Sequence, residues 1–447
     1  MLILIFSHSI VNAQDPFLIS GPMVGFVEHR SALIWIEVSQ EVKTAAIRYW
    51  EKDNTEFYYE MDAKGNYGNP YNPIKFELVK LKMNTVYQYE IMLNNKTIPF
   101  PLAKTFKTKE VWEGRKPAPD FSFMMGSCTN IRDAVTDNPN EDFTPDAGIL
   151  STMANLKTDF MLWLGDNLFF RESDYSSVAG MHYRYSTQRK NFDLQDLLCS
   201  RPNYAIWDDH DYGPNDSNRY FELKAASQQL FKDYWGNKSY GEPDNEGIYS
   251  KFSWSDCDFF LTDDRSFRSP NEIKDSLGGK PNCDKKYWGE KQLLWLKNSL
   301  LSSKATFKFI AVGNEVLNPM GDKESLRKYP CEFNELMAFI AQYKIDGIIF
   351  LTGDRHFSEV CTVQTKGMYK LYDICSSSIS SKPVDLTGKS EMNNTFRLPN
   401  TLVSVNNFSI LNISGEGQER KVKMITLDKK GEVKSSLEIP AKELKFK

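Results

Sequence analysis

The first part of the chain contains short runs in which apolar and polar residues alternate. Clusters of Gly, Asn and Pro separate these runs between Phe17 and residue 110. Alternation with a period of two buries one face of each segment, and such spacing is typical of small β domains. The runs cover residues 31–38, 44–50, 74–80 and 85–93. We therefore predict an all-β sandwich over residues 17–110, followed by a linker at 111–120 that contains two prolines and no periodicity.

From residue 121 the pattern changes to continuous apolar runs, each closed by Gly or Asp. Such runs fit strands that are covered on both faces. They cover residues 121–126, 159–165, 203–208, 258–263, 307–313 and 347–353. Between them lie helical segments, clearest at 332–344, where Phe333, Leu336, Met337 and Ile340 recur at helical spacing. Alternating strands and helices predict an α/β domain over 121–447, with β runs near the C-terminus completing its sheet.

Composition excludes some classes of protein. The 447 residues include 55 basic and 59 acidic side chains, which gives a net charge of −4, and 41% of the residues are hydrophobic. These values are ordinary for a globular protein, and the length allows two or three domains. Without a basic block, the chain lacks the charge pattern that nucleic-acid duplex binding needs. The longest apolar runs have strand length, so no transmembrane segment is expected.

Residues 1–13 predict a secretory signal. An apolar run is followed by small and polar residues, with Val11 and Ala13 at the minus-three and minus-one positions of a cleavage site. A buried N-terminal strand is the alternative. Export would place the protein in the periplasm or outside the cell, where Cys283 and Cys331 could pair. The sequence leaves disulfide pairing open among Cys199, Cys257, Cys283, Cys331, Cys361 and Cys375.

Chemically active residues follow five of the six apolar runs. Ligands bind at the carboxyl ends of the strands in α/β sheets, so these residues are expected to meet there. A strand followed by Gly-Asp usually marks only a turn or a helix cap, but five such sites in succession indicate a common centre. The sites are Ser127-Cys128, Gly165-Asp166-Asn167, residues 208–211, residues 263–265 and residues 353–356.

The residue types suggest a metal centre. Asp354 and His356 would share one side of an extended segment and could reach one cation. His210 lies between Asp209 and Asp211, whose charges favour its protonated form and suit it to donate a proton. With only five histidines in the chain, carboxylates must dominate, which favours hard or ferric cations over zinc.

Arg265 and Arg268 add donors for an anion. Their planar guanidinium groups suit a pair of anionic oxygens, although Arg268 alone could equally form a surface salt bridge. Metals, a central carboxylate and arginines together predict phosphoester hydrolysis, in which metals generate hydroxide and neutralise the phosphoryl group.

At these residues the sequence resembles the alkaline phosphatase D (PhoD-like) family of metallophosphatases. The resemblance runs from residue 21 to the terminal strands and is most specific in WDDHDYGPND at 207–216 and LTGDRH at 351–356. It implies a fibronectin-like β domain before a calcineurin-like α/β/β/α catalytic domain, with two or more metal ions, namely ferric iron and calcium.

The resemblance also implies a role for each site residue. Cys128 and His356 would bind iron, and Asp166 would bridge the metals. The calcium side would use Asp354, Asn215 and the aspartates Asp208 and Asp209. Arg265, Arg268 and Asn167 would bind substrate, and His210, Asp209 and Arg265 would be catalytic.

One position departs from the family. The metal-binding tyrosine three residues after the bridging aspartate is Phe169 here, which has no donor atom. Tyr175 or another group could substitute. The identity of the first metal is therefore open.

We predict an exported, metal-dependent hydrolase of phosphate monoesters or diesters. The substrate would be a small phosphoester, including phospholipid head groups or nucleotide-derived esters, and a phospholipase D-like phosphodiesterase is a variant within the class. A rival from another class is a surface binding protein with a decayed phosphatase domain, which only Phe169 supports. We expect a monomer.

Overall fold

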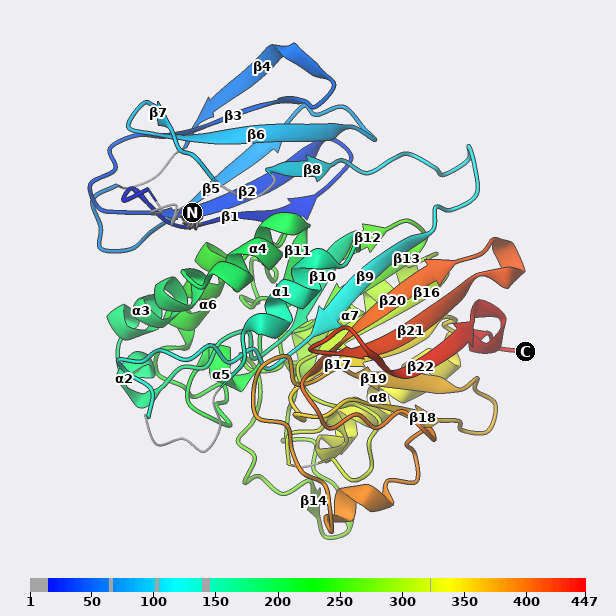
Figure 1. The fold of residues 1–447 in the computed structure, drawn as a ribbon. Coiled ribbons are helices and arrows are strands. Elements are labelled where there is room, and N and C mark those ends of the chain that lie inside the picture. The colour runs from blue at the N-terminus through cyan, green and yellow to red at the C-terminus, as the bar shows by residue number, and fades with distance from the viewer. Residues whose placement is uncertain (1–14, 64–66, 101–103, 139–144, 322) are drawn as a thin grey trace, which may run out of the picture.

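The computed structural model describes residues 15–63, 67–100, 104–138, 145–321 and 323–447. Figure 1 shows a small β region above a larger region with two sheets and flanking helices. The predicted signal at 1–13 lies outside the described residues.

The N-terminal region consists of two antiparallel sheets. The first has the order β1 (Leu18–Val27), β2 (Ser31–Val38), β5 (Asn72–Val79); the second joins β4 (Asn54–Asp62), β3 (Ala45–Glu51), β6 (Val86–Leu93) and β7 (Lys96–Thr97), with β8 (Thr105–Lys107) also paired to β6. Side chains from both sheets, including Ile34, Phe76, Ile47 and Tyr89, form one core. The four predicted strands are therefore present. The fibronectin-like assignment stays a prediction.

The first large sheet carries three of the predicted catalytic loops. Its order is β11 (Asn203–Ile206), β10 (Phe160–Leu164), β9 (Phe121–Gly126), β20 (Asn407–Ser414), β21 (Lys421–Asp428), β22 (Val433–Pro440). The strands β9, β10 and β11 are parallel, and β20 pairs antiparallel with β9. The C-terminal strands thus complete this sheet, as predicted.

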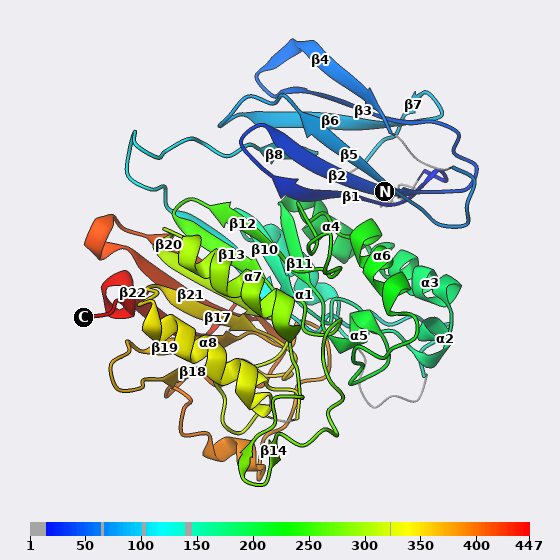
Figure 2. The same cartoon turned by 180° about the vertical axis from the view of Figure 1, so that it is seen from behind.

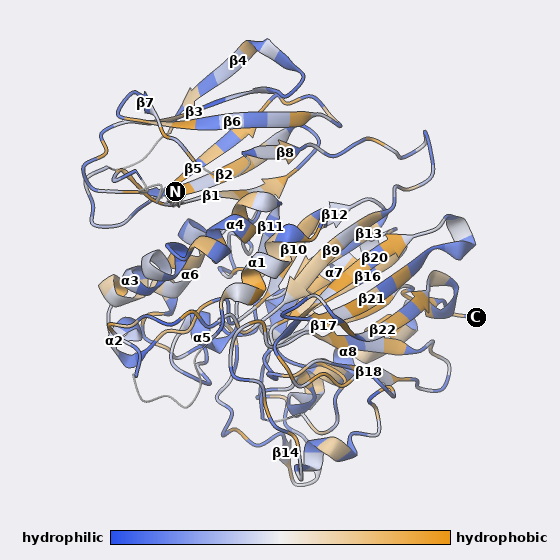
Figure 3. Ribbon diagram, viewed as in Figure 1, coloured by the Kyte–Doolittle hydropathy of each residue, from blue (hydrophilic) through white to orange (hydrophobic). Residues whose placement is uncertain are grey.

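The second large sheet carries the remaining loops. Its order is β12 (Ser250–Trp254), β13 (Cys257–Leu261), β16 (Phe307–Val312), β17 (Ile348–Thr352), β19 (Leu371–Cys375), β18 (Glu359–Val363). The four strands β13, β16, β17 and β19 are parallel. Figure 3 shows that the strands of both large sheets carry mostly apolar residues, as strands covered on both faces require.

Aromatic rings join the two large sheets. Phe123 of β9 packs edge-on against Phe259 of β13 at 5.2 Å and Phe309 of β16 at 5.4 Å between ring centroids. Phe160 of β10 meets Phe252 of β12 at 5.6 Å. These contacts fix the sheets face to face, and edge-to-face pairs contribute about 0.5–1.5 kcal/mol each beyond burial.

Helices cover the outer faces of the two sheets. In Figure 2, α7 (Gly289–Ser302) and α8 (Pro330–Gln342) lie in front of the second sheet. Helix α8 corresponds to the helix predicted at 332–344, and Leu336 and Ile340 are buried in it. It begins two residues earlier, with Pro330 in its first turn, and ends two residues earlier, at Gln342. The helices beside the first sheet are α1 (Gly148–Asn155), α3 (Val178–Arg189), α4 (Phe192–Ser200) and α6 (Lys224–Tyr234).

The remaining short elements connect these layers. They are α2 (Glu172–Tyr175), α5 (Asp209–Tyr212), β14 (Ser276–Leu277), β15 (Lys280–Pro281), η1 (Leu326–Lys328), η2 (Ser390–Asn393), η3 (Gly417–Glu419) and η4 (Ala441–Leu444). Residues 111–120 hold no regular element, in keeping with a linker. The domain boundaries themselves stay predictions. No helix among the described residues is long and apolar enough to cross a bilayer.

Cys283 and Cys331 form a disulfide, whereas Cys128, Cys199, Cys257, Cys361 and Cys375 are buried and lie outside it. The predicted possibility of a 283–331 pair is thus realised. It ties the segment before α7 to the first turn of α8.

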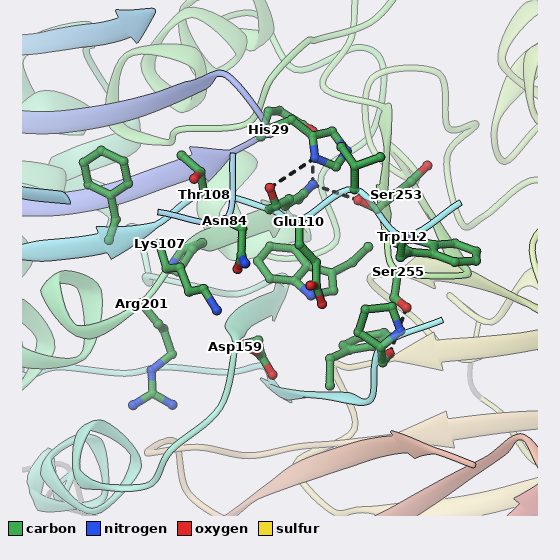
Figure 4. Close-up of a pocket in the computed structure, with 18 of the residues that line it drawn as sticks. His29, Asn84, Lys107, Thr108, Glu110, Trp112, Asp159, Arg201, Ser253 and Ser255 are labelled. Carbon is green, nitrogen blue, oxygen red and sulfur yellow. Dashed lines mark hydrogen bonds and ion pairs between the residues drawn. The ribbon is translucent and has the colours of Figure 1, made fainter. Parts of the chain in front are cut away.

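One cavity lies away from the predicted site. It has a volume of about 600 Å³ and lies between the β region and the start of the catalytic region. Figure 4 shows His29 and Thr108 on one side and Asp159 and Arg201 on the other. Because Phe121 and Asp159 stand at the amino ends of β9 and β10, the cavity is at the opposite end of the strands from the loops described next.

Candidate metal centre

The loops after β9, β10, β11 and β17 meet at the carboxyl ends of their strands. Four of their residues have left-handed backbones: Cys128, Asp166, Asp354 and His356, with φ of 59°, 51°, 69° and 56°. Left-handed geometry is uncommon for residues other than glycine and concentrates at functional sites, where the surrounding structure enforces it. These sharp turns let side chains from separate strands face one another.

The first cluster combines sulfur, oxygen and nitrogen donors. Ligand atoms of Cys128, Asp166 and His356 all lie within 4.8 Å of one another. The Cys128 thiol is 3.4 Å from an Asp166 oxygen. Burial raises the pKa of the Cys128 thiol, and the charges of Asp166 and Asp354 raise it further. A cation is therefore what would stabilise the thiolate here.

His356 is oriented for binding through one nitrogen. Its Nδ1 lies 2.8 Å from the carbonyl of Lys382, which can only accept, so Nδ1 carries the proton and Nε2 keeps its lone pair. Burial lowers the pKa of His356 to about 4, so the ring is neutral near pH 7. A neutral imidazole held by a carbonyl is the usual form of a metal-ligating histidine.

The second cluster contains only carboxylates. Oxygens of Asp166, Asp208, Asp209 and Asp354 all lie within 4.8 Å of one another. One oxygen of Asp208 accepts from Arg265, whereas its buried Oδ2 has no hydrogen-bond partner among the described residues. Burial and neighbouring carboxylates raise the pKa of Asp166 and of Asp208, although Arg265 opposes the shift at both. An orphaned oxygen among crowded carboxylates fits a hard cation.

The two clusters share Asp166. Its side chain is 1% exposed, and one of its oxygens accepts from the backbone N–H of His210. A carboxylate common to a mixed-donor cluster and an all-oxygen cluster can bridge two cations.

The His210 ring lies near the same carboxylates. His210 lies in α5, and a ring nitrogen is within 4.8 Å of oxygens of Asp166 and Asp209. The neighbouring Asp211 instead accepts from the backbone N–H groups of Asp166, Asn167 and Asp208. Asp211 therefore ties the β10 and β11 loops together.

Asn167 is buried beside the clusters. Its amide nitrogen donates to the carbonyl of Ile206 and to Asp211, at 2.7 and 2.6 Å. Its buried Oδ1 has no hydrogen-bond partner among the described residues. The predicted role of Asn167 in substrate binding stays a prediction.

A third group contains two residues, Asp216 and Glu324, that the sequence analysis missed. Oxygens of Asp209, Asp216 and Glu324 lie within 4.8 Å of one another. Asn215, the predicted ligand, is exposed, whereas the next residue, Asp216, donates its backbone N–H to Asp209 at 2.7 Å. The motif DYGPND indicated this loop but not which of its side chains turns inward. Glu324 follows no apolar run, so no local signal could have identified it.

Both predicted arginines are completely buried. Arg265 bonds to Asp208 and Glu324, and Arg268 to Glu324 and the hydroxyl of Tyr329. Each is 0% exposed. These contacts make the guanidinium groups the counter-charges of the carboxylates. The binding of phosphate by these arginines stays a prediction. The surface salt bridge considered for Arg268 is instead a buried salt bridge with Glu324.

The predicted geometry of Asp354 and His356 is wrong. The two residues do not lie on one side of an extended segment, because the chain leaves β17 at Thr352 and both residues are left-handed. The turn delivers Asp354 to the carboxylate cluster and His356 to the cluster with Cys128. The side chains therefore serve different clusters.

Phe169 points toward the centre. Its ring centroid lies 4.3 Å from that of His210 and 6.5 Å from that of His356. Tyr175, the alternative donor considered, lies in α2 and packs against the hydrophobic core. The Phe169 ring thus lies beside both histidines, and the loss of a metal-binding tyrosine at this position stays a prediction.

The residue before Asp166 must be glycine, because the backbone of Gly165 packs closely against Asp208. The φ of Gly165 is +95°, and an added Cβ would lie 2.8 Å from the Cβ and 2.9 Å from the backbone nitrogen of Asp208. We expect Gly165→Ala to lower the free energy of unfolding by more than the roughly 1 kcal/mol of backbone strain alone, and to lower metal content.

Gly68→Ala is the matched control, because Gly68 has φ +90° and nothing within 4 Å of an added Cβ. Urea unfolding of both variants separates the steric cost from the backbone cost. Equal losses in the two variants would show that the contact with Asp208 is unimportant.

Comparison with known proteins identifies relatives of this chain. A family model described as PhoD-like phosphatase matches residues 123–438. Alkaline phosphatase D of Bacillus subtilis is 22% identical over 356 residues, which are 69% of this chain and 58% of that protein. The chain thus spans less than two thirds of this relative's length.

Solved structures show the same fold. A structure of PhoD superimposes with a TM-score of 0.75 at 17% identity, covering 95% of this chain and 94% of that one. A purple acid phosphatase from seeds of yellow lupin (Lupinus luteus) gives 0.65 at 12% identity, over 94% of this chain and 74% of that one. The mixed α/β fold is therefore that of the metallophosphatases, and the chain belongs to the PhoD-like phosphatase family.

Proposed function

We propose that this protein is a metal-dependent phosphoesterase that acts on small phosphate esters. The single observation that carries the proposal is Asp166, shared between the Cys128–His356 cluster and the carboxylate cluster. That arrangement can hold two cations side by side. Family membership agrees with this reading.

The donor sets suggest different cations for the two positions. Thiolate and imidazole at Cys128 and His356 suit iron or zinc, whereas the oxygens of Asp208, Asp209 and Asp354 suit a hard cation such as calcium. Bound metals at such a site lower the pKa of water and neutralise charge on the phosphoryl group.

The chain's own residues would do the remaining work. His210, beside Asp166 and Asp209, is placed to donate a proton to the leaving oxygen. Arg265 holds one oxygen of Asp208 and leaves the other available to a cation. Arg265→Lys tests whether Arg265 also contacts substrate. The variant keeps the positive charge but removes the planar guanidinium group with its paired donors, and we expect it to raise KM more than it lowers kcat.

We also propose that the protein is exported to the periplasm or the cell exterior. The Cys283–Cys331 disulfide supports an oxidising compartment. The apolar run at 1–13 supports a signal.

Turnover of a substrate panel tests the function. The purified protein should hydrolyse p-nitrophenyl phosphate or bis-p-nitrophenyl phosphate. The ratio of the two kcat/KM values shows whether the enzyme prefers monoesters or diesters. Phosphatidylcholine vesicles test the phospholipase D-like variant. Tight binding of these esters without hydrolysis, in metal-loaded protein, would favour the decayed binding protein instead.

Phe169→Tyr tests the position of the missing ligand. If the ring points at the cation, as its contacts with His210 and His356 suggest, the new phenolate should raise iron retention and create a visible charge-transfer band. Absorption spectra and metal analysis give the answer. A tyrosinate band already present in wild-type protein would contradict the idea that Phe169 vacates this ligand position, and would redirect attention to Tyr175.

A further inference from the structure

A second pocket lies beside the metal centre. It has a volume of about 410 Å³ and is lined by the 271–275 loop, Lys285, Lys323 and Lys328. The loop leads into the β14–β15 hairpin, which projects in Figure 1 from the end of the molecule remote from the β region. No motif in the sequence indicated this pocket.

Among the described residues of its wall, lysines outnumber acids. The lysines are Lys274, Lys285, Lys323 and Lys328, and the acids are Glu272 and Asp275, both exposed. Lys323 is ion-paired with Asp216, but the structure gives no ion pair with a described carboxylate for the other three ammonium groups. The pocket is therefore a local excess of positive charge in a protein whose net charge is −4.

Lys285 is the most unusual of the four. The residue is 3% exposed, and its ammonium contacts one carbonyl, that of Asn271 at 3.3 Å, and the ring of Tyr329 at 4.6 Å. Burial lowers the pKa of Lys285, and the charges of Arg268 and Lys328 lower it further. The charges of Asp275 and Glu272 raise the pKa and oppose part of this shift. A buried ammonium group is stabilised strongly by a bound anion.

A disulfide and an aromatic ring connect two parts of the wall. The Cys283–Cys331 disulfide joins the chain two residues before Lys285 to the chain three residues after Lys328. The Tyr329 ring centroid lies 4.6 Å from the Lys285 ammonium and 5.2 Å from the Arg268 guanidinium carbon, and the Tyr329 hydroxyl accepts from Arg268 at 2.8 Å. The chain segments that carry Lys285 and Lys328 are thus joined to each other.

The pocket connects to the metal centre through two side chains. Asn271 in its wall donates to Glu324 at 3.1 Å, and Glu324 lies within 4.8 Å of Asp209 and Asp216. Lys323 lines the pocket and pairs with Asp216. A substrate with one phosphate at the centre could therefore place a second anionic group among the lysines.

We propose that this lysine pocket binds a second phosphate group of the substrate, so that the enzyme prefers phosphoesters carrying two phosphates over those carrying one. The proposal rests on the proposed function, because it takes the metal centre as the place of hydrolysis. Lys285 and Lys328 would be the specificity-determining residues, since neither lies in the metal clusters.

A series of alkane-1,n-bisphosphates and alkyl monophosphates of equal length tests this preference. Phosphate release from each ester gives the kcat/KM of the bisphosphate divided by that of the monophosphate. If the second phosphate is not recognised, this ratio is about 2, because a bisphosphate carries two equivalent groups that can be hydrolysed. We expect a ratio about tenfold above that at the best chain length, falling to about 2 in Lys285→Met.

Lys304→Met is the matched control, because Lys304 is exposed after α7 and lies outside the pocket. It should keep the wild-type ratio, and thermal unfolding should show that Lys285→Met is folded. If Lys285→Met does not fold, Lys328→Met replaces it. A wild-type ratio of about 2 at every length, with normal monophosphate hydrolysis, would overturn the second-phosphate proposal and leave the proposed function standing.

Calorimetry asks the same question without turnover. Tripolyphosphate titrated into metal-stripped protein should bind about tenfold more weakly to Lys285→Met than to wild type or Lys304→Met. Equal affinities in the three proteins would overturn the proposal, whether or not the metal-loaded enzyme hydrolyses any ester.

Discussion

Asp166→Asn should lose metal and about 10³-fold or more in kcat, which corresponds to roughly 4 kcal/mol of transition-state stabilisation. Asp166 is the one side chain common to the mixed-donor cluster and the carboxylate cluster, so its neutralisation weakens both cation positions at once. Metal analysis of the purified variant and turnover of the best panel substrate give the two readouts.

Asp53→Asn serves as the control, because Asp53 is exposed in the turn between β3 and β4 and lies far along the chain from the centre. Normal metal content with normal turnover in Asp166→Asn would remove the bridging assignment. Loss of turnover with full metal content would move Asp166 from metal binding to substrate positioning.

His210→Ala should cost roughly 10²–10⁴-fold in kcat, with the largest loss on esters that have poor leaving groups. The reason is that His210, beside Asp166 and Asp209, would protonate the departing oxygen, and a good leaving group such as p-nitrophenolate needs little help. A plot of log kcat against leaving-group pKa, steeper in the variant than in wild type, is the expected signature.

His29→Ala is the corresponding control, since His29 is exposed in the cavity at the opposite end of the strands. An equal loss for all leaving groups in His210→Ala would assign His210 to electrostatic stabilisation. Release of metal from the variant would contradict the prediction that His210 is not a primary metal ligand.

Much of the fold could be predicted because strand patterns are local. Apolar runs such as 121–126 and 347–353 became β9 and β17 with bounds close to those predicted. The β character of the C-terminal chain also followed from its alternation, whereas its pairing with β9 is seen only in the structure. Sheet order and the facing of the two sheets depend on distant contacts, such as Phe123 against Phe259, and came only from the resemblance.

The candidate site was predictable where residues directly follow strands. Cys128, Asp166 and Asp208 come together because parallel strands end at one edge. The arrangement of Asp354 and His356 was not predictable, since tertiary packing imposes their left-handed backbones. Glu324 and the lysine pocket were missed because residues 313–330 carry no periodicity, and the Glu324 contacts with Arg265 and Asn271 span more than fifty positions of sequence.

Metal stoichiometry measured together with turnover tests the central claim most directly. Stripped wild-type protein, titrated with iron or zinc and then calcium, should regain hydrolysis in parallel with bound metal and reach its maximum only with at least two ions per chain, because two clusters share Asp166. Full turnover in chelated protein that holds less than one ion per chain would contradict the account.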